Sequence, residues 1–125
     1  GNVQDSVGNL MRAFRDLHMH VLFLCKEAVI NDDGVLRHAP KMVGQQLGET
    51  VTYFFDEVLA LRIIEDQDEE GRNTRNRWLQ TVYGQGYKAK DRSGKLDDFE
   101  RPDISALIEK LGFSLTNITK GESNE

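Results

Sequence analysis

The arrangement of this chain is decided by the stretch Tyr87-Lys88-Ala89-Lys90-Asp91-Arg92-Ser93-Gly94-Lys95-Leu96. Lys88 and Lys90 alternate, so on a β-strand both side chains point to the same face, and Arg92 follows in an expected turn. Arginine can bind phosphate through two parallel hydrogen bonds, while lysine supplies a compact charge. The stretch therefore suits a ligand that carries phosphate groups. The alternative is a solvated edge strand whose lysines oppose aggregation.

Length and charge bound the class of protein. The 125 residues have room for one domain with a modest core. No apolar run could cross a bilayer, no secretory signal is visible, and the single Cys25 excludes an internal disulfide framework. The formal net charge is -5, yet residues 72–95 hold seven basic side chains and one acidic side chain. A local basic surface on an acidic body can hold phosphates without general stickiness.

The elements on either side of the stretch predict a hairpin and a helix. Residues 58–64 and 77–83 read as two strands joined by a polar tip, and Asp56 is expected to end a turn before them. Trp78 is expected to pack in the core rather than to offer a stacking platform. After the stretch, residues 102–111 predict a helix that stops at Gly112.

The amino-terminal part predicts a helix and a buried strand. Residues 3–17 show the apolar spacing of an amphipathic helix, and the apolar run 21–25 suits a strand buried in a parallel sheet. Ligands of open α/β sheets gather at the carboxyl ends of strands. Lys26 and Glu27, directly after this run, are therefore a candidate sensor of a bound group, or else a surface ion pair.

The next segment predicts a functional or mobile loop. Asn31-Asp32-Asp33-Gly34 is a turn signal, and no periodicity follows through Pro40. Arg37 and Lys41 bring positive charge to this loop. No metal site is predicted, because His18 and His20 lack a third ligand.

These elements predict an α/β fold: a mixed sheet with parallel core strands and an antiparallel edge hairpin, flanked by helices. Residues 1–112 are expected to form the domain, and residues 113–125 a polar, frayed tail. Three segments carry a resemblance over about residues 10–111: Pro40-x-x-x-Gly44, Phe55-Asp56-Glu57-Val58-Leu59 and the opening stretch. With them the chain resembles the carboxyl-terminal half of a RecA-like P-loop ATPase core with a three-layer fold. It is similar to phage-encoded ATP-binding proteins of the single-strand annealing and recombination type.

The resemblance implies roles for particular residues. In such assemblies a neighbouring subunit supplies cations to the γ-phosphate of ATP; Lys88, Lys90 and Arg92 match, with Arg92 the first choice. Arg37 and Lys41 match the place where relatives contact single-stranded DNA. Lys26 or Glu27 matches the polar residue that reports nucleotide state, although relatives often carry His or Gln there.

One motif of the family is absent. No Gly-x-x-x-x-Gly-Lys-[Ser/Thr] occurs, and no early apolar strand ends in a credible magnesium-binding Asp. The resemblance therefore implies a longer protein that binds ATP and Mg²⁺, contacts single-stranded DNA, assembles with itself, has no membrane partner and works in the cytoplasm of a bacterial host. This chain alone is not expected to hydrolyse ATP. The alternative is a stand-alone nucleic-acid-binding or assembly module without nucleotide chemistry.

Overall fold

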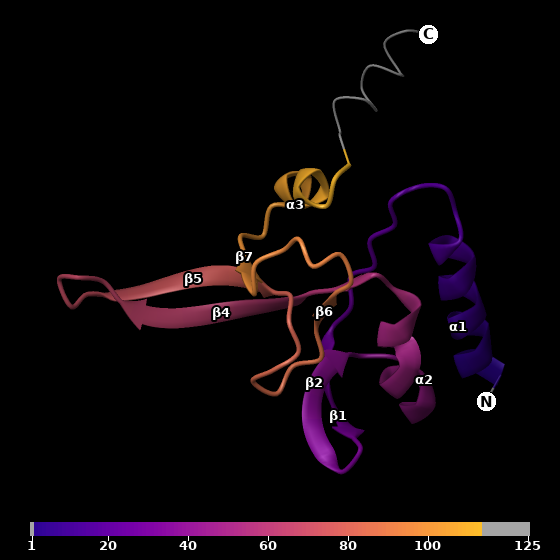
Figure 1. Ribbon diagram of the computed structural model, residues 1–125. Helices are drawn as coiled ribbons and strands as arrows, with labels where there is room; N and C mark the ends of the chain where they lie inside the picture. Colours follow the sequence, from indigo (N-terminus) through magenta and orange to yellow (C-terminus); the bar gives the residue numbers. More distant parts are fainter. Residues whose placement is uncertain (1, 114–125) are drawn as a thin grey trace, which may run out of the picture.

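The computed structural model describes residues 2–113, apart from the side chains of residues 45, 46 and 49, and within these bounds the fold is mixed α/β (Figure 1). The described strands form a two-stranded sheet β1–β2, a two-stranded sheet β3–β6 and a three-stranded sheet β4–β5–β7. In chain order the elements are α1 (Asn2–Arg15), β1 (Glu27–Asp32), β2 (Val35–Pro40), α2 (Gln45–Thr50), the 3-10 helix η1 (Val51–Phe54), β3 (Glu57–Val58), β4 (Ala60–Gln67), β5 (Asn73–Gln80), β6 (Lys90–Asp91), β7 (Phe99–Glu100) and α3 (Ile104–Lys110).

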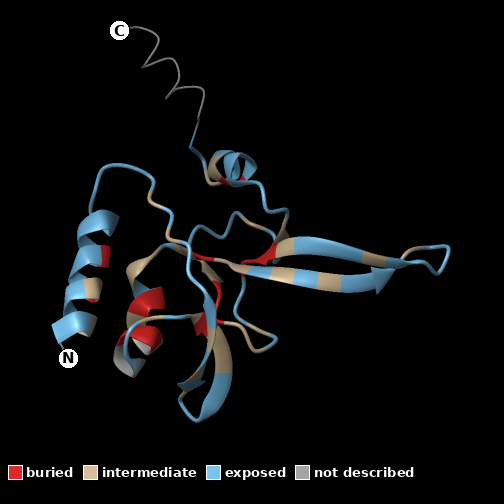
Figure 2. Cartoon of the chain, turned by 180° about the vertical axis from the view of Figure 1, so that it is seen from behind, coloured by how far each residue is buried: buried red, intermediate tan, exposed pale blue. Residues whose placement is uncertain are grey.

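The hydrophobic core lies between α1 and the α2–η1 segment; the part of the molecule around it is called here the body. Met11, Leu47 and Val51 are buried there, with Phe23 and Phe55 among the half-buried residues packed against them. Figure 2 shows the buried positions gathered on α2 and η1 and where β4 and β5 join the body. The amphipathic helix predicted over residues 3–17 is confirmed as α1, which ends two residues earlier.

The apolar run 21–25 is not a strand. It is irregular, and Leu24 is 88% exposed. All paired strands of the described residues are antiparallel, and the parallel contact is an isolated bridge between His38 and Tyr87. The predicted parallel core is therefore not present in the described residues. A buried central strand needs neighbours on both sides, and no described segment occupies those positions.

The predicted loop after residue 31 is a hairpin instead. β1 and β2 pair antiparallel from Glu27–Pro40 to Asp32–Val35. Asp33 and Gly34 form its turn with φ of 54° and 85°, the positive values that a type I′ turn requires. The Asn31 side-chain oxygen accepts a hydrogen bond from the Gly34 N–H at 2.8 Å. Arg37 consequently sits on a strand.

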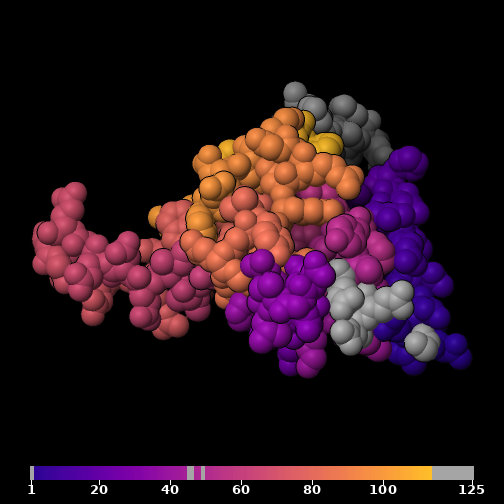
Figure 3. Space-filling model, turned by 60° about the horizontal axis from the view of Figure 1, so that its bottom comes forward, coloured from indigo at the N-terminus to yellow at the C-terminus, as the bar shows by residue number. Residues whose placement is uncertain are grey.

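The second hairpin, β4–β5, is confirmed and forms a projecting arm. Figures 1 and 3 show it standing clear of the body. At its tip the Asp68 carboxylate accepts hydrogen bonds from the backbone N–H groups of Glu70 and Arg72, both at 2.9 Å. Trp78 is half-buried near the base, with the Arg101 guanidinium 4.3 Å from its ring centre. The sequence predicts Trp78 in the core, but it is not among the buried residues and packs at the base of the arm instead.

The segment that follows β5 contains two short strands, each paired with an earlier strand. β6 pairs with β3, and β7 pairs with the base of β5. The helix predicted over residues 102–111 is confirmed as α3, which buries Leu107. Gly112 follows it at a φ of 100°, a conformation that favours glycine and ends a helix. Of the predicted tail, residues 114–125 lie outside the described residues.

Candidate functional site

Lys88 lies outside the regular strands and Lys90 begins β6, so the two lysines do not alternate along one strand as predicted. Both line a hollow of about 230 Å³. Its walls come from the β1–β2 hairpin, η1, β3 and the segment around β6; the lining residues are Asp32, Thr52, Tyr53, Val58, Tyr83, Lys88, Ala89 and Lys90. The backbone of Lys88 is fixed on β2, because its N–H donates to the His38 carbonyl at 2.8 Å. This hollow is the candidate site.

A group of four residues, called here the Asp32 cluster, joins segments distant in sequence: Asp32, Tyr83 and Lys88, which line the hollow, and Arg37, which contacts Asp32 from outside the lining. The Tyr83 hydroxyl donates to Asp32 at 2.9 Å. The Lys88 Nζ and the Arg37 Nε lie 3.8 Å and 3.9 Å from the same carboxylate. One carboxylate therefore brings together a predicted DNA contact and a predicted phosphate contact.

Each cation of the Asp32 cluster also lies over an aromatic ring. The Arg37 guanidinium is 4.6 Å from the ring centre of Tyr83, and the Lys88 ammonium is 5.6 Å from that of Tyr53. Partial burial raises the pKa of the Tyr83 hydroxyl, and its hydrogen bond to Asp32 raises it further. At neutral pH Tyr83 therefore keeps the proton that it donates. The cluster combines positive charge with flat apolar surface.

Lys90 differs from the other cations of the stretch. No carboxylate oxygen of the described side chains lies within the 4.0 Å of an ion pair from its Nζ. Burial lowers the pKa of Lys90, and the nearby positive charge of Arg92 lowers it further. A bound anion beside the ammonium group would favour its charged form and so oppose both effects.

Arg92 is held by a carboxylate. Its Nη1 lies 2.6 Å from the Asp56 Oδ1, and its backbone N–H donates to the Asp56 carbonyl at 3.0 Å. Both side chains are mostly exposed, so the ion pair is weak enough to open for a competing phosphate. Within the turn, the Asp91 carboxylate accepts from the N–H groups of Ser93 and Leu96, both at 2.9 Å. Arg92 is thus presented at a fixed turn.

Glu57 stands opposite Asp91 in the β3–β6 pair. Burial raises the pKa of Glu57 to about 7, and the neighbouring Asp91 carboxylate adds to this effect. Burial alone would raise the pKa of Asp91, but hydrogen bonds to its carboxylate hold that pKa below its ordinary value. Near neutral pH the two carboxyl groups can therefore share a proton.

The predicted sensor residues do not reach the hollow. Lys26 precedes β1 and is exposed, and its carbonyl accepts from the Lys41 N–H at 2.7 Å. Glu27 begins β1, where its Oε2 lies 3.3 Å from the His38 Nδ1. Neither residue follows a parallel strand as predicted, because residues 21–25 form none. Lys41 lies at the open end of the same hairpin and does not line the hollow either.

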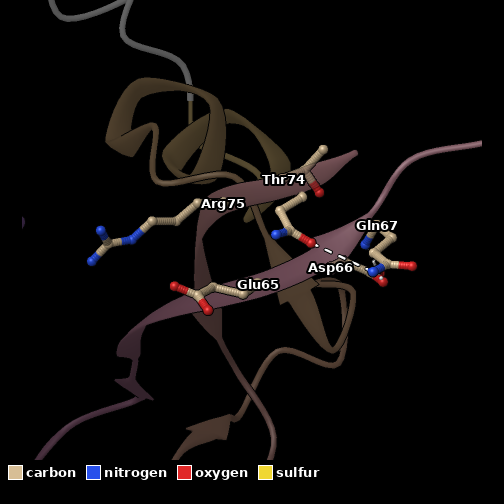
Figure 4. Close-up of a pocket in the computed structure, with 6 residues that line it drawn as sticks. Glu65, Asp66, Gln67, Thr74 and Arg75 are labelled. Atoms are coloured by element: carbon tan, nitrogen blue, oxygen red, sulfur yellow. Dashed lines mark hydrogen bonds between the residues drawn. The ribbon is translucent and has the colours of Figure 1, made fainter. Parts of the chain in front are cut away.

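A second hollow of about 520 Å³ lies along the arm (Figure 4). Its lining comes from β4 and β5 alone, with the Gln67 side chain donating to Asn73 at 3.5 Å. Glu65 and Arg75 face each other across the strands, so opposite charges offset one another there. A two-stranded ribbon has no third wall, and we do not treat this surface as a site.

Sequence reasoning missed three residues of the candidate site: Asp32 as the centre of a cluster, and Tyr53 and Tyr83 as exposed rings. Asp32 and Tyr83 are 51 positions apart, and no local pattern joins them. The turn signal at residues 31–34 could have located Asp32, because Asp-Gly between short strands is a strong hairpin signal.

Comparison with known proteins adds no relative. No protein-family model, curated protein or solved structure matches this chain. In the described residues no helix is long and apolar enough to span a membrane. No group of three or more His, Cys, Asp or Glu side chains among them could hold a metal ion.

Proposed function

We propose that this chain is the carboxyl-terminal part of a RecA-like ATP-binding protein of the phage annealing and recombination type. As a whole, that protein binds ATP with Mg²⁺ and single-stranded DNA, assembles with copies of itself and acts in the cytoplasm of its bacterial host. The part proposed for this chain is to bring cations to a triphosphate that a neighbouring subunit holds.

The pairing of β3 with β6 carries the proposal. Two of the segments that carry the resemblance, residues 55–59 and 87–96, are distant in sequence but adjacent in space, with Val58 opposite Lys90. Their junction presents Lys90 beside the turn that holds Arg92. Cations at an exposed strand end can meet the charge that develops on a transferred phosphoryl group.

The geometry reverses the expected order of these cations. Arg92 has to leave Asp56 before it can contact a phosphate, whereas no described carboxylate forms an ion pair with Lys90. Lys90 is therefore the first candidate and Arg92 the second. Lys88 is 9% exposed and belongs to the Asp32 cluster, so we assign it to the hollow instead.

The apolar run 21–25 supports the part of the proposal that concerns a larger fold. Leu22 and Leu24 are 60% and 88% exposed, although the sequence there suits a central strand. Exposed apolar runs of this kind mark contact surfaces. In the proposed protein, strands of the remaining domain pair with this run and complete a parallel sheet with layers of helices.

ATP turnover by the full-length protein tests this function. Replacing the cation, Lys90→Ala, should reduce turnover about a thousandfold, in the range known for cations supplied to a transferred phosphoryl group. Arg92→Ala should also reduce it, and Arg77→Ala on the arm is the control for loss of one positive charge. Unchanged turnover in Lys90→Ala and Arg92→Ala would contradict the proposal.

A mixing experiment then tests whether the cation acts on a neighbouring subunit. Subunits with Lys90→Ala should be combined with subunits whose phosphate-binding loop is disabled. Turnover should reappear in the mixture, because some interfaces then join an intact loop to an intact Lys90. Absence of recovery in assembled mixtures would contradict action between subunits.

A second candidate function is a stand-alone module that binds single-stranded nucleic acid. The observation in its favour is the hollow itself, where cations and exposed tyrosine rings meet within this one chain. Binding of single-stranded DNA by the 125-residue chain without nucleotide favours the module. Binding that requires ATP and the full-length protein favours the first function.

A further inference from the structure

Tyr53 presents an exposed ring from a rigid backbone. The ring is on η1, directly after Val51 and Thr52, which are buried. Tyr53 itself is 70% exposed, and Tyr83, which also lines the hollow, is 47% exposed. Buried neighbours hold the backbone of η1 in place while the ring remains open to contact. Such a ring is a suitable stacking platform for a planar ligand.

The charges around the hollow favour a base at its centre and phosphates at its rim. Asp32 lies among the cations and is only partly exposed. The carboxylate can accept a hydrogen bond from a base amino group, whereas a phosphate, which offers only acceptor oxygens at neutral pH, cannot donate one to it. Carboxylates accept from the amino group of cytosine in this way.

The size of the hollow agrees with one base. Its volume of about 230 Å³ equals the space of about eight water molecules in the liquid. A single base fits a space of this volume, while a whole nucleoside triphosphate does not. Lys90, at the same hollow, can then meet a phosphate of the strand that leaves it.

We infer that the hollow binds one base of a single-stranded nucleic acid, stacked on Tyr53, with its amino group donating to Asp32. Arg37 and Lys90 contact the flanking phosphates. This inference rests on the second candidate function, single-strand binding by this chain alone, and adds to it a location and a base preference. Bases with an amino group, such as cytosine, are preferred over thymine.

Fluorescence anisotropy with three labelled oligonucleotides of equal length, about ten nucleotides, tests the inference on the 125-residue chain. The probes are oligo-dC, oligo-dT and an abasic strand, compared at one salt concentration. Oligo-dC should bind about tenfold more tightly than oligo-dT, and the abasic strand should bind more weakly than both. Loss of one stacked base costs about tenfold in affinity.

Variants separate stacking from charge. Tyr53→Ala should weaken oligo-dC binding about tenfold, while Tyr53→Phe keeps the ring and should bind normally. Asp32→Asn preserves the shape of the side chain but adds a donor, so the preference for cytosine over thymine should disappear. Arg77→Ala, which removes a cation from the arm, should leave the preference unchanged.

Equal binding of the three probes, or unchanged binding in Tyr53→Ala, would overturn the inference and leave contact with the phosphate backbone alone. Absence of any binding by the chain would overturn it as well. None of these results bears on the proposed contact between Lys90 and a triphosphate. That contact is measured by ATP turnover of the full-length protein in the absence of DNA.

Discussion

The contact between β3 and β6 depends on pH through the carboxyl group of Glu57. This group faces Asp91 across the strand pair, and its Oε2 is buried without a described hydrogen-bond partner. When Glu57 is protonated, it can donate to Asp91. When it is ionised, two carboxylates face each other beside the turn that carries Arg92. The protonation state of Glu57 therefore affects how firmly this turn is held.

The free energy of unfolding should fall as the pH rises from about 4.5 to about 7. The ordinary pKa of Glu57 is 4.5, and the folded value is about 7. In this window the folded state binds the proton and the unfolded chain does not, so raising the pH favours unfolding. Because Glu57 is partly exposed, we expect a change on the order of 1–2 kcal/mol. Thermal unfolding across this range measures it.

Glu57→Gln is the variant that isolates this effect. The amide cannot ionise, so the fall in stability over this window should flatten. Asp91 has a lowered pKa, and its contribution is lost only as the pH falls below its ordinary 3.8, outside the window. Glu65→Gln on the arm is the control and should keep the wild-type profile. An unaltered profile in Glu57→Gln would contradict the role given to this carboxyl group.

At the scale of single residues the sequence predicted which side chains carry charge but not which ones meet. The alternation predicted for Lys88 and Lys90 requires a strand, but only Lys90 belongs to one, and Ala89 between them lines the same hollow. Asp56 as the partner of Arg92 could not be foreseen, because 36 positions separate them. Such contacts depend on the packing of β3 against β6.

Among the elements, α3 depends on its first turn. The helix has only seven residues, and the Asp103 side chain accepts a hydrogen bond from the Ala106 N–H at 3.1 Å. Short helices gain most of their stability from packing and caps. Leu107, the buried residue of α3, keeps its place only while the helix is formed. The Asp103 cap therefore holds α3 against the body.

Asp103→Ala should lower the free energy of unfolding by about 1 kcal/mol, the usual cost of a lost cap. Asp103→Asn keeps an acceptor at the same position and should behave nearly as the wild type. Chemical denaturation of the three proteins gives the comparison. Equal stability of all three would show that the hydrogen bond to Ala106 contributes nothing.

Elements with their own local signal were predictable, and elements that require a partner were not. Apolar spacing located α1 and α3, and the polar tip located the β4–β5 hairpin. Residues 35–40, which form β2, lack the alternation of a half-buried strand, so the sequence predicts a loop where the β1–β2 hairpin lies. The composition of the run 21–25 predicts a buried strand. A strand forms there only if neighbouring strands pair with it, and the described chain does not supply them.

For the whole molecule, stability rests on a small core. Leu47 is 4% exposed and packs with Met11 and Val51 between α1 and the α2–η1 segment. Replacing a buried leucine by alanine costs about 2–5 kcal/mol, and domains are stable by about 5–15 kcal/mol. Leu47→Ala should therefore remove a large part of the free energy of unfolding.

Thermal unfolding of Leu47→Ala should show a large fall in the melting temperature, whereas Leu61→Ala, at a position on the arm that is 59% exposed, should change it little. Equal melting temperatures for both variants would show that the cluster around Leu47 is not the stabilising core. The β4–β5 arm buries little apolar surface, so neither variant should change the pairing of its strands.

The distribution of charge over the whole molecule sets how binding depends on salt. The net charge is -5, so the body as a whole repels nucleic acid and only local cations can attract it. If Arg37 and Lys90 each neutralise one phosphate of a single strand, log K should fall with log salt with a slope of about -1.4. Lys90→Ala should reduce the slope by about 0.7, whereas Arg75→Ala on the arm should leave it unchanged.

Titrations of the labelled oligo-dC at several salt concentrations measure these slopes. Equal loss in both variants would mean that the strand binds along the arm rather than at the hollow.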